Sequence, residues 1–73
     1  SSRYGIEDIE VPKEWRGKSL LKLDIRKKYG VNVIAVKSRD SEKVISPPSD
    51  YVFAAGDIAV IAGENECIRR IKY

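Results

Sequence analysis

Histidine does not occur in this 73-residue chain, and Cys67 is its single cysteine. The lack of histidine removes the commonest general base and the commonest zinc ligand. One cysteine can form neither an internal disulfide nor a thiolate metal cluster, which fits a reducing compartment. Phosphate-binding glycine loops and nucleophile motifs are absent from the sequence too. We therefore predict that the chain is not an enzyme and that it holds no metal and no cofactor.

An acidic cluster near the start of the chain does not change that prediction. Glu7, Asp8 and Glu10 lie within four residues of one another. On an extended strand their side chains fall mostly along a solvated edge, and they do not converge as a catalytic acid and base would.

Long apolar runs are also missing. No run approaches the roughly 20 residues that span a bilayer, and no cationic and then apolar signal segment opens the chain. We predict a cytoplasmic location. The net charge of +3 is a mild excess that favours an anionic partner only weakly.

The length sets a limit of one domain, residues 1–73. A chain this short buries only about 60% of the surface that its unfolded form exposes, so its core is thin. Small domains of this kind often gain stability by pairing with a second copy. The opening residues 1–5 resemble a cut end, and we expect a domain excised from a longer protein.

The pattern of apolar residues predicts a compact α+β domain of order β-α-β-β-β-α with a mixed, mostly antiparallel sheet. The expected strands are residues 6–11, 31–37, 43–46 and 58–62, and the expected helices are residues 19–29 and 64–72. Ser19 and Asp24 are candidate N-caps, and Gly30 is placed to end the first helical region. Trp15, in a loop, is expected to fold back over the core.

The strongest strand signal is the run from Val31 to Lys37, which is β-branched and almost continuously apolar. A strand of this composition is usually covered on both of its faces. A single thin domain has little to cover the second face with, so the run favours a partner chain.

Polar residues that suit recognition gather around the same strand. Arg26 offers a planar fork for phosphate, Lys28 a point charge, and Asn32 both a donor and an acceptor. With the apolar neighbours of Asn32 they would make a small-ligand pocket. On spacing alone a simpler interpretation is favoured: Asp24 caps a helix, Arg26 and Lys28 are solvated, and Asn32 completes a turn.

Three separated blocks resemble the RCK_C (TrkA-C) domain. These blocks are residues 11–20, residues 23–37 (Leu-Asp-Ile-Arg-Lys-Lys-Tyr-Gly-Val-Asn-Val-Ile-Ala-Val-Lys), and Ser46-Pro47 together with residues 56–63. They occur in the family's order and cover nearly the whole chain. Domains of this family regulate bacterial potassium uptake, some cation antiporters and a few winged-helix transcription regulators.

The resemblance implies a homodimer that pairs through the helix and the following strand and holds a ligand in the groove between copies. In many members from Gram-positive bacteria this ligand is the nucleotide cyclic di-AMP. The family's ligand positions fall on Leu21, Asp24, Ile25, Arg26, Lys28, Asn32, Val33, Ile34, Ala35 and Pro47. Arg26 matches the phosphate-contacting arginine and Asn32 the polar strand residue. A hairpin histidine of some members is missing here, and Ser41 lies near its place.

The implied function is control of potassium, or of another cation or osmolyte, through a membrane transporter to which the parent protein would belong. That would place the domain at the inner face of the membrane. One alternative is a dimerisation module without a ligand, in a transporter or in a winged-helix regulator. Another is a nucleic-acid-binding fragment, which the charge would allow. The shortage of aromatic stacking platforms argues against direct nucleic-acid binding by this domain.

Overall fold

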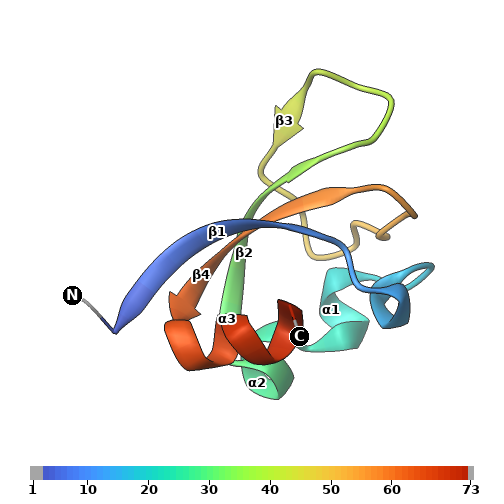
Figure 1. Ribbon diagram of the computed structural model, residues 1–73. Coiled ribbons are helices and arrows are strands. Elements are labelled where there is room, and N and C mark those ends of the chain that lie inside the picture. Colours follow the sequence, from blue (N-terminus) through green and yellow to red (C-terminus); the bar gives the residue numbers. More distant parts are fainter. Residues whose placement is uncertain (1–2, 73) are drawn as a thin grey trace.

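A four-stranded sheet runs through the computed structural model, which describes residues 3–72 (Figure 1). The strands are β1 (Tyr4–Glu10), β2 (Val31–Lys37), β3 (Val44–Ile45) and β4 (Ile58–Glu64). The helices are the 3₁₀ helix η1 (Lys13–Trp15), α1 (Leu20–Leu23), α2 (Ile25–Tyr29) and α3 (Asn65–Lys72). Within residues 3–72, no helix has the length and apolar character needed to cross a membrane.

The strand order β1-β4-β2-β3 confirms the α+β class and the mostly antiparallel sheet. All three pairings are antiparallel, so the parallel pair that a mixed sheet requires is missing from the described residues. The reason is the position of β4. Both β1 and β2 run antiparallel to β4 and therefore parallel to each other, as a strand–helix–strand unit implies, but β4 lies between them and separates them.

The first helical region is broken into α1 and α2 at Asp24. Ser19 caps α1 as predicted, because its Oγ accepts a hydrogen bond from the Lys22 N–H at 3.0 Å. Asp24 is the N-cap residue of α2 as predicted, but its side chain makes no capping hydrogen bond. Gly30 ends α2 with φ of 75°, as a helix-ending glycine should.

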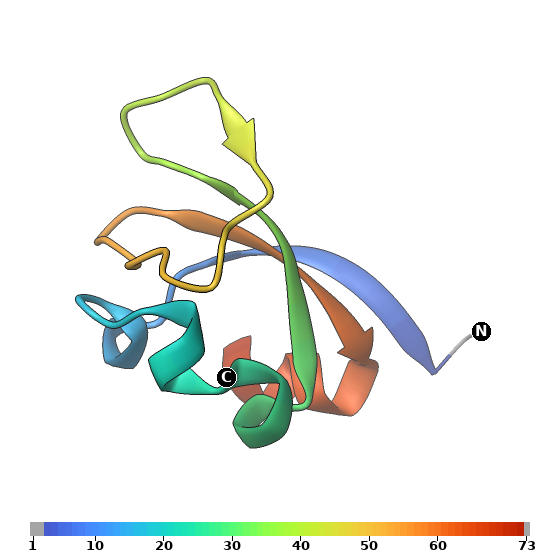
Figure 2. The ribbon, with the colours of Figure 1, turned by 180° about the vertical axis from the view of Figure 1, so that it is seen from behind.

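The helices gather on one side of the sheet, seen in Figure 1 and from behind in Figure 2. Between these helices and the sheet lies the core, whose buried residues are Ile9, Val11, Trp15, Leu23, Ile25, Val31, Val36, Phe53, Ala59, Ile61 and Ile68. Trp15 folds back over this core as expected and is fully buried. Its ring packs against Tyr29 at 5.4 Å and against Phe53 at 5.3 Å between ring centroids. These aromatic contacts fix the 3₁₀ helix against α2.

A buried carboxylate holds the loop that leads into β4. Asp57 is 1% exposed, and its Oδ2 accepts hydrogen bonds from Tyr51 Oη at 2.6 Å and from the Ala54 N–H at 3.0 Å. Its backbone C=O accepts a bond from the Val11 N–H at 2.9 Å. Burial, followed by the hydrogen bond to Asp57, raises the pKa of Tyr51 to about 12. Asp57 therefore joins the end of β1 to the start of β4.

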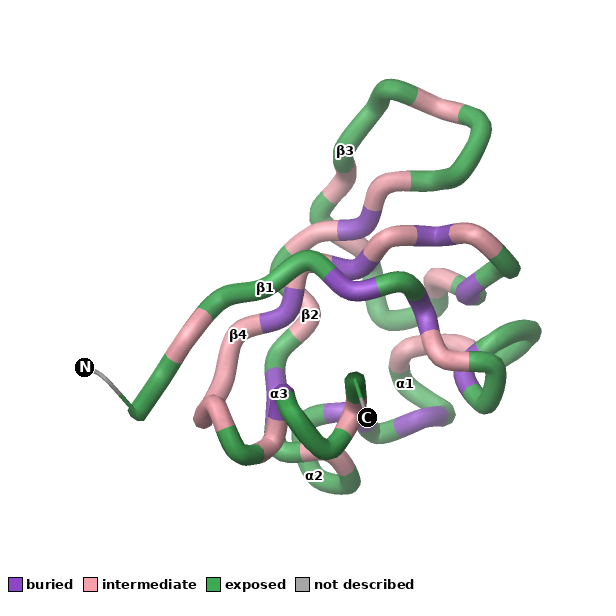
Figure 3. The backbone as a smooth tube through the Cα atoms, viewed as in Figure 1, coloured by how far each residue is buried: buried purple, intermediate pink, exposed green. Residues whose placement is uncertain are grey.

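Among residues 3–72, no helix covers the second face of the sheet. Figure 3 shows buried residues near the end of β1, in the first half of β4 and near both ends of β2, while the loop between β2 and β3 is mostly exposed. On the outer face Ile6 and Ala62 are paired neighbours, as are Val60 and Ala35. Ile6 is 65% exposed and the other three are half-buried. The outer face thus leaves apolar side chains of β2 and β4 partly in water, next to the exposed carboxylates Asp8 and Glu10 of β1.

Candidate functional site

The second edge of β2 is partly free. β2 pairs with β4 along most of its length but with β3 only at Val36 and Lys37. Among residues 3–72, no strand pairs with the second edge of the stretch from 31 to 35. Backbone N–H and C=O groups on such an edge remain available to another molecule.

A register shift changes the direction of the side chains in the middle of β2. The pairing of β2 with β4 skips a residue between Val33 and Ala35, which leaves Ile34 as the extra residue. Bulges of this kind bend a strand and turn a side chain away from its regular direction. The Ile34 side chain is 44% exposed as a result, although it belongs to a strand of mostly buried composition.

Asp24 has an unusual backbone conformation beside this edge. With φ of 50° and ψ of 51°, it has the only positive φ of a non-glycine within residues 3–72. Its N–H donates to the carbonyls of Leu20 and Leu21, and its C=O accepts from the Lys27 and Lys28 N–H groups. Both backbone polar groups of Asp24 are thus hydrogen-bonded at the junction of α1 and α2, and the side chain is exposed. Left-handed conformations cost a non-glycine residue about 1–2 kcal/mol and often occur at functional positions.

Six of the ten predicted ligand positions face solvent in one copy, Ile34 among them. Arg26 and Lys28 on α2 are exposed, as are Asp24, Asn32 and Leu21, and Leu21 reaches 71%. Neither Arg26 nor Lys28 has an ion pair within the described part of the chain. Their charges are therefore available to an anionic ligand.

The other positions divide between the two faces of the sheet. Asn32 and Ala35 pair with residues of the outer face, Ala62 and Val60, whereas Val33 pairs with buried Ile61. Ile25 is 2% exposed and belongs to the core, so its side chain reaches a ligand only if α2 moves. Val33 and Pro47 are half-buried. The structure therefore brings Asn32, Ile34 and Ala35 to one surface and separates Val33 and Ile25 from it.

Ser41, at the place of the family's hairpin histidine, is already engaged in its own turn. Its Oγ accepts a hydrogen bond from the Lys43 N–H at 2.9 Å. A ligand contact at this point would have to share that oxygen, so the site depends more on Arg26 and Lys28.

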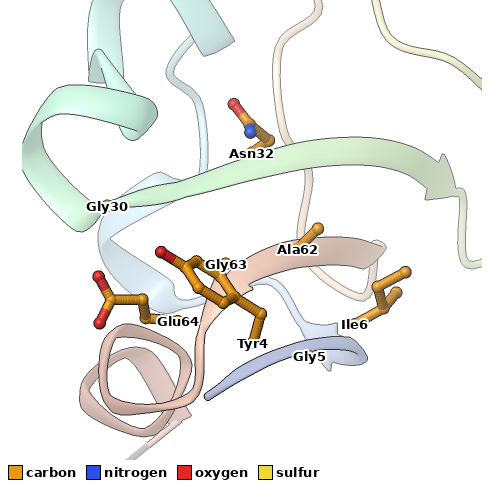
Figure 4. A pocket seen from close by; sticks show the side chains of 8 residues that line it. All are labelled: Tyr4, Gly5, Ile6, Gly30, Asn32, Ala62, Gly63 and Glu64. Carbon is orange, nitrogen blue, oxygen red and sulfur yellow. The ribbon is translucent and has the colours of Figure 1, made fainter. Parts of the chain in front are cut away.

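A hollow of about 500 Å³ lies at the Asn32 end of the outer face (Figure 4). Its lining residues are Tyr4, Gly5, Ile6, Gly30, Asn32, Ala62, Gly63 and Glu64. Tyr4 and Ile6 project from β1 on either side of the short Ala62 side chain. Only Asn32 was predicted among these residues. The small residues Ala62 and Gly63 could have indicated a hollow, because they leave room on the strand surface. Their place opposite Asn32, however, depends on the strand order.

The donor set of the site is suited to recognition. Within residues 3–72, no three His, Cys, Asp or Glu side chains lie close enough to hold a metal ion. The groups that these two consecutive elements do present are exposed cations on α2, an amide and exposed apolar side chains on β2, and a free strand edge. These groups can bind a ligand that is anionic and partly apolar.

The sequence model of the family described as TrkA-C domain matches residues 6–72. The chain belongs to this family. The match includes every helix and nearly all of every strand described above, so the resemblance noted from the sequence is confirmed.

Relatives of this TrkA-C domain are potassium transport proteins. Ktr system potassium uptake protein C of Bacillus subtilis (strain 168) is 35% identical over 72 residues, which is 99% of this chain and 32% of that protein. K(+)/H(+) antiporter subunit KhtT of the same organism is 33% identical over 55 residues, 75% of this chain and 33% of the relative. The chain thus spans about a third of the length of these curated relatives.

Two solved structures share the fold. The RCK C domain of potassium transport protein KtrA, solved in complex with cyclic di-AMP, has a TM-score of 0.82 and 32% identity, covering 97% of this chain and 82% of that one. The GsuK channel bound to NAD has a TM-score of 0.83 at 20% identity, covering 96% of this chain and 13% of that one, and its likeness shows the fold alone. The α+β prediction is confirmed by both structures.

Proposed function

We propose that this TrkA-C domain binds cyclic di-AMP in a groove between two copies and thereby regulates a potassium or related cation or osmolyte transport system. The observation that carries the proposal is the exposed Arg26, which has no ion pair within residues 3–72 and lies on α2, the helix that leads into β2 and contacts it. The neighbour that is 32% identical over nearly the whole chain was solved with that ligand.

The ligand's symmetry fits a pair of copies. Cyclic di-AMP carries two phosphates and two adenines related by a two-fold axis, and a two-fold dimer presents every recognition group twice. Two Arg26 and two Lys28 side chains would then offset the phosphate charges by charge-assisted hydrogen bonds. Asn32 would read the polar edge of a base, and Ile34, Ala35 and Pro47 would supply apolar contact.

The outer face and the free β2 edge supply what the dimer needs. Ile6, Val60 and Ala62 leave apolar surface in water in one copy. Burying such surface against a second copy is favourable at roughly 25 cal/mol per Å². The dimer expected from the helix and following strand would place the ligand where α2 and β2 of the two copies meet.

Regulation would follow from two dimer geometries with different affinities for the ligand. A ligand shifts an equilibrium only by its differential affinity for the two states. The domain would act at the cytoplasmic face of the membrane, as one part of a longer protein that contacts the transporter. No step of this scheme involves catalysis, in line with the prediction that the chain is not an enzyme.

A dimerisation module without a ligand, in a transporter or in a winged-helix regulator, is the second candidate. The apolar outer face favours it, because that surface calls for a partner whether or not a ligand is present. The hairpin histidine of some family members is absent from this chain, which also removes one contact that a ligand could use.

Titration calorimetry with cyclic di-AMP, combined with light scattering, separates the two candidates. We expect one ligand to bind two chains, and 5′-AMP, which cannot bridge two copies, to bind far more weakly. A dimer that binds no cyclic di-AMP at tens of micromolar would contradict the first candidate and favour the dimerisation module without a ligand. A monomer at high concentration would contradict both candidates.

A further inference from the structure

The positive charge of the chain is concentrated in one short stretch. Residues 13–28 contain seven cations and two carboxylates, a net charge of +5, against +3 for the whole chain. The rest of the molecule therefore carries a net charge of −2. The mild overall excess conceals a strongly cationic segment that covers η1, α1 and α2.

Five of these cations lie outside the predicted ligand positions. We name them the cationic corner: Lys13, Arg16, Lys18, Lys22 and Lys27. All five are exposed, and none of them has an ion pair within residues 3–72. The elements that carry them follow one another along one end of the molecule in Figure 1 and in Figure 2.

Exposed apolar side chains stand among these charges. Leu21 lies next to Lys22 on α1 and is 71% exposed. Val52 is 53% exposed and lies beside the start of α1, because its backbone forms a bridge with Ser19. Lysines around exposed aliphatic side chains are the pattern of surfaces that rest on a membrane interface.

We propose that the cationic corner binds an anionic phospholipid surface. Clusters of four to eight Lys or Arg residues attract such surfaces, and each cation near the surface contributes to the affinity. Four of the five are lysines, which act as point charges and suit a diffuse layer of anions, whereas bidentate recognition of one group would favour arginine. A smaller hollow of about 290 Å³ lies between β1 and α3, and neither this hollow nor the one at Asn32 is lined by a corner cation. A broad, flat anionic surface such as that of a phospholipid membrane fits these features better than a peptide that binds in a groove.

The test is sedimentation of the chain with vesicles of phosphatidylcholine, alone or mixed with phosphatidylglycerol. We expect binding to the mixed vesicles only, with an affinity that falls steeply as salt is raised. The variant Lys13→Gln/Lys18→Gln/Lys22→Gln should bind about a hundredfold more weakly, at about fivefold for each cation lost. Val52→Ser should weaken binding by about threefold, because the partly exposed aliphatic group no longer enters the interface.

A matched control removes the same charge elsewhere. Lys37→Gln/Arg39→Gln/Lys43→Gln also lowers the net charge by three but lies on β2 and the loop before β3, away from the corner. It should keep its vesicle affinity within about threefold, since distant charges are screened. Circular dichroism should show both triple variants folded, and cyclic di-AMP titration of the corner variant should match the parent.

Several results would overturn the proposal. Equal losses in the two triple variants would show that net charge alone drives the binding. Salt-insensitive binding, or equal binding to neutral vesicles, would exclude an electrostatic contact with lipid. Binding of poly-L-glutamate without binding of anionic vesicles would identify the corner as a site for acidic polypeptides.

Discussion

The side of the molecule formed by β1, β4 and α3 differs from the η1–α1–α2 end in how its charges are used. On the first side Glu7 pairs with Lys72 across 65 residues of sequence, and Glu66 pairs with Arg69 on α3. At the other end, seven cations between residues 13 and 28 have no ion pair in the described chain. The two ends have similar numbers of exposed charges but satisfy them differently.

That difference suggests that charges on the first side contribute to stability and that charges at the other end serve recognition. The paired groups on the first side, such as Glu7 and Lys72, meet their partners within one copy, so changing them should alter folding and leave binding intact. The cations at the other end have no ion pair within residues 3–72, and Leu21 there is exposed, so removing these side chains should cost little stability. The predictions below test this division, beginning with the largest effect.

Asp57→Ala should have the largest effect on stability. The change leaves the Tyr51 hydroxyl and the Ala54 N–H without their acceptor in a buried place. We expect the free energy of unfolding to fall by about 3 kcal/mol, measured by urea denaturation. Asp50→Ala, an exposed carboxylate of the same loop region, is the control and should change it by less than about 0.5 kcal/mol. Equal effects of the two changes would show that the buried network contributes little.

Arg26→Ala should have the opposite profile. Each ligand would lose two charge-assisted contacts, one from each copy, at about 1.5 kcal/mol each, so cyclic di-AMP binding should weaken more than about a hundredfold in calorimetry. The guanidinium is exposed and has no ion pair within residues 3–72. The free energy of unfolding, measured by urea denaturation, should therefore change by less than about 0.5 kcal/mol. Lys27→Ala, its neighbour on α2, should leave the affinity for this ligand nearly unchanged. An Arg26→Ala chain that binds as tightly as the parent would remove Arg26 from the site.

Tyr51→Phe should lower stability by about 1 kcal/mol below pH 10, because one hydrogen bond to Asp57 is lost. The pKa of Tyr51 is raised from 10.0 to about 12 in the folded chain, so folding favours the protonated phenol. The stabilisation is therefore complete below pH 10 and is lost as pH rises towards 12. Denaturation midpoints of parent and variant should converge over this range. A constant gap between the midpoints up to pH 12 would mean that Tyr51 does not titrate as the structure indicates.

Local patterns predicted much of the fold. The strand from Val31 to Lys37 has the bounds expected from its β-branched run between Gly30 and a turn. Ser19 caps its helix, and Gly30 ends the helical region, because both roles depend on the residue's own side chain or backbone freedom. A second helix start at Asp24 was among the predictions, but the left-handed conformation of Asp24 was not, since it is fixed by how two short helices pack and its sequence neighbours do not reveal it.

Long-range pairing determines the part of the site that the sequence did not indicate. That Tyr4 and Ala62 share a hollow with Asn32 follows from the insertion of β4 between β1 and β2. The bulge at Ile34 decides which β2 side chains reach the outer face, and it depends on the register with β4. Exposed cations such as Arg26 were easier to predict, because the family motif names their positions and burial does not oppose them.

Glu7 shows the same limit on the first side of the molecule, and it supports the smallest prediction. Its sequence neighbours suggested a solvated edge, yet its Oε1 lies 2.7 Å from the Lys72 Nζ. Glu7→Gln should lower the free energy of unfolding by about 0.5 kcal/mol, the usual size for a partly exposed ion pair. Raising the ionic strength from about 0.1 M to about 1 M shortens the screening length from about 10 Å to about 3 Å and should erase that difference. Asp8→Asn, with no ion pair in the described chain, should show neither the loss nor its salt dependence. If Glu7→Gln were as silent as Asp8→Asn, then the pairing of charges on this side would not contribute to stability. The contrast between the two ends of the molecule would then depend on Asp57 and the apolar core alone.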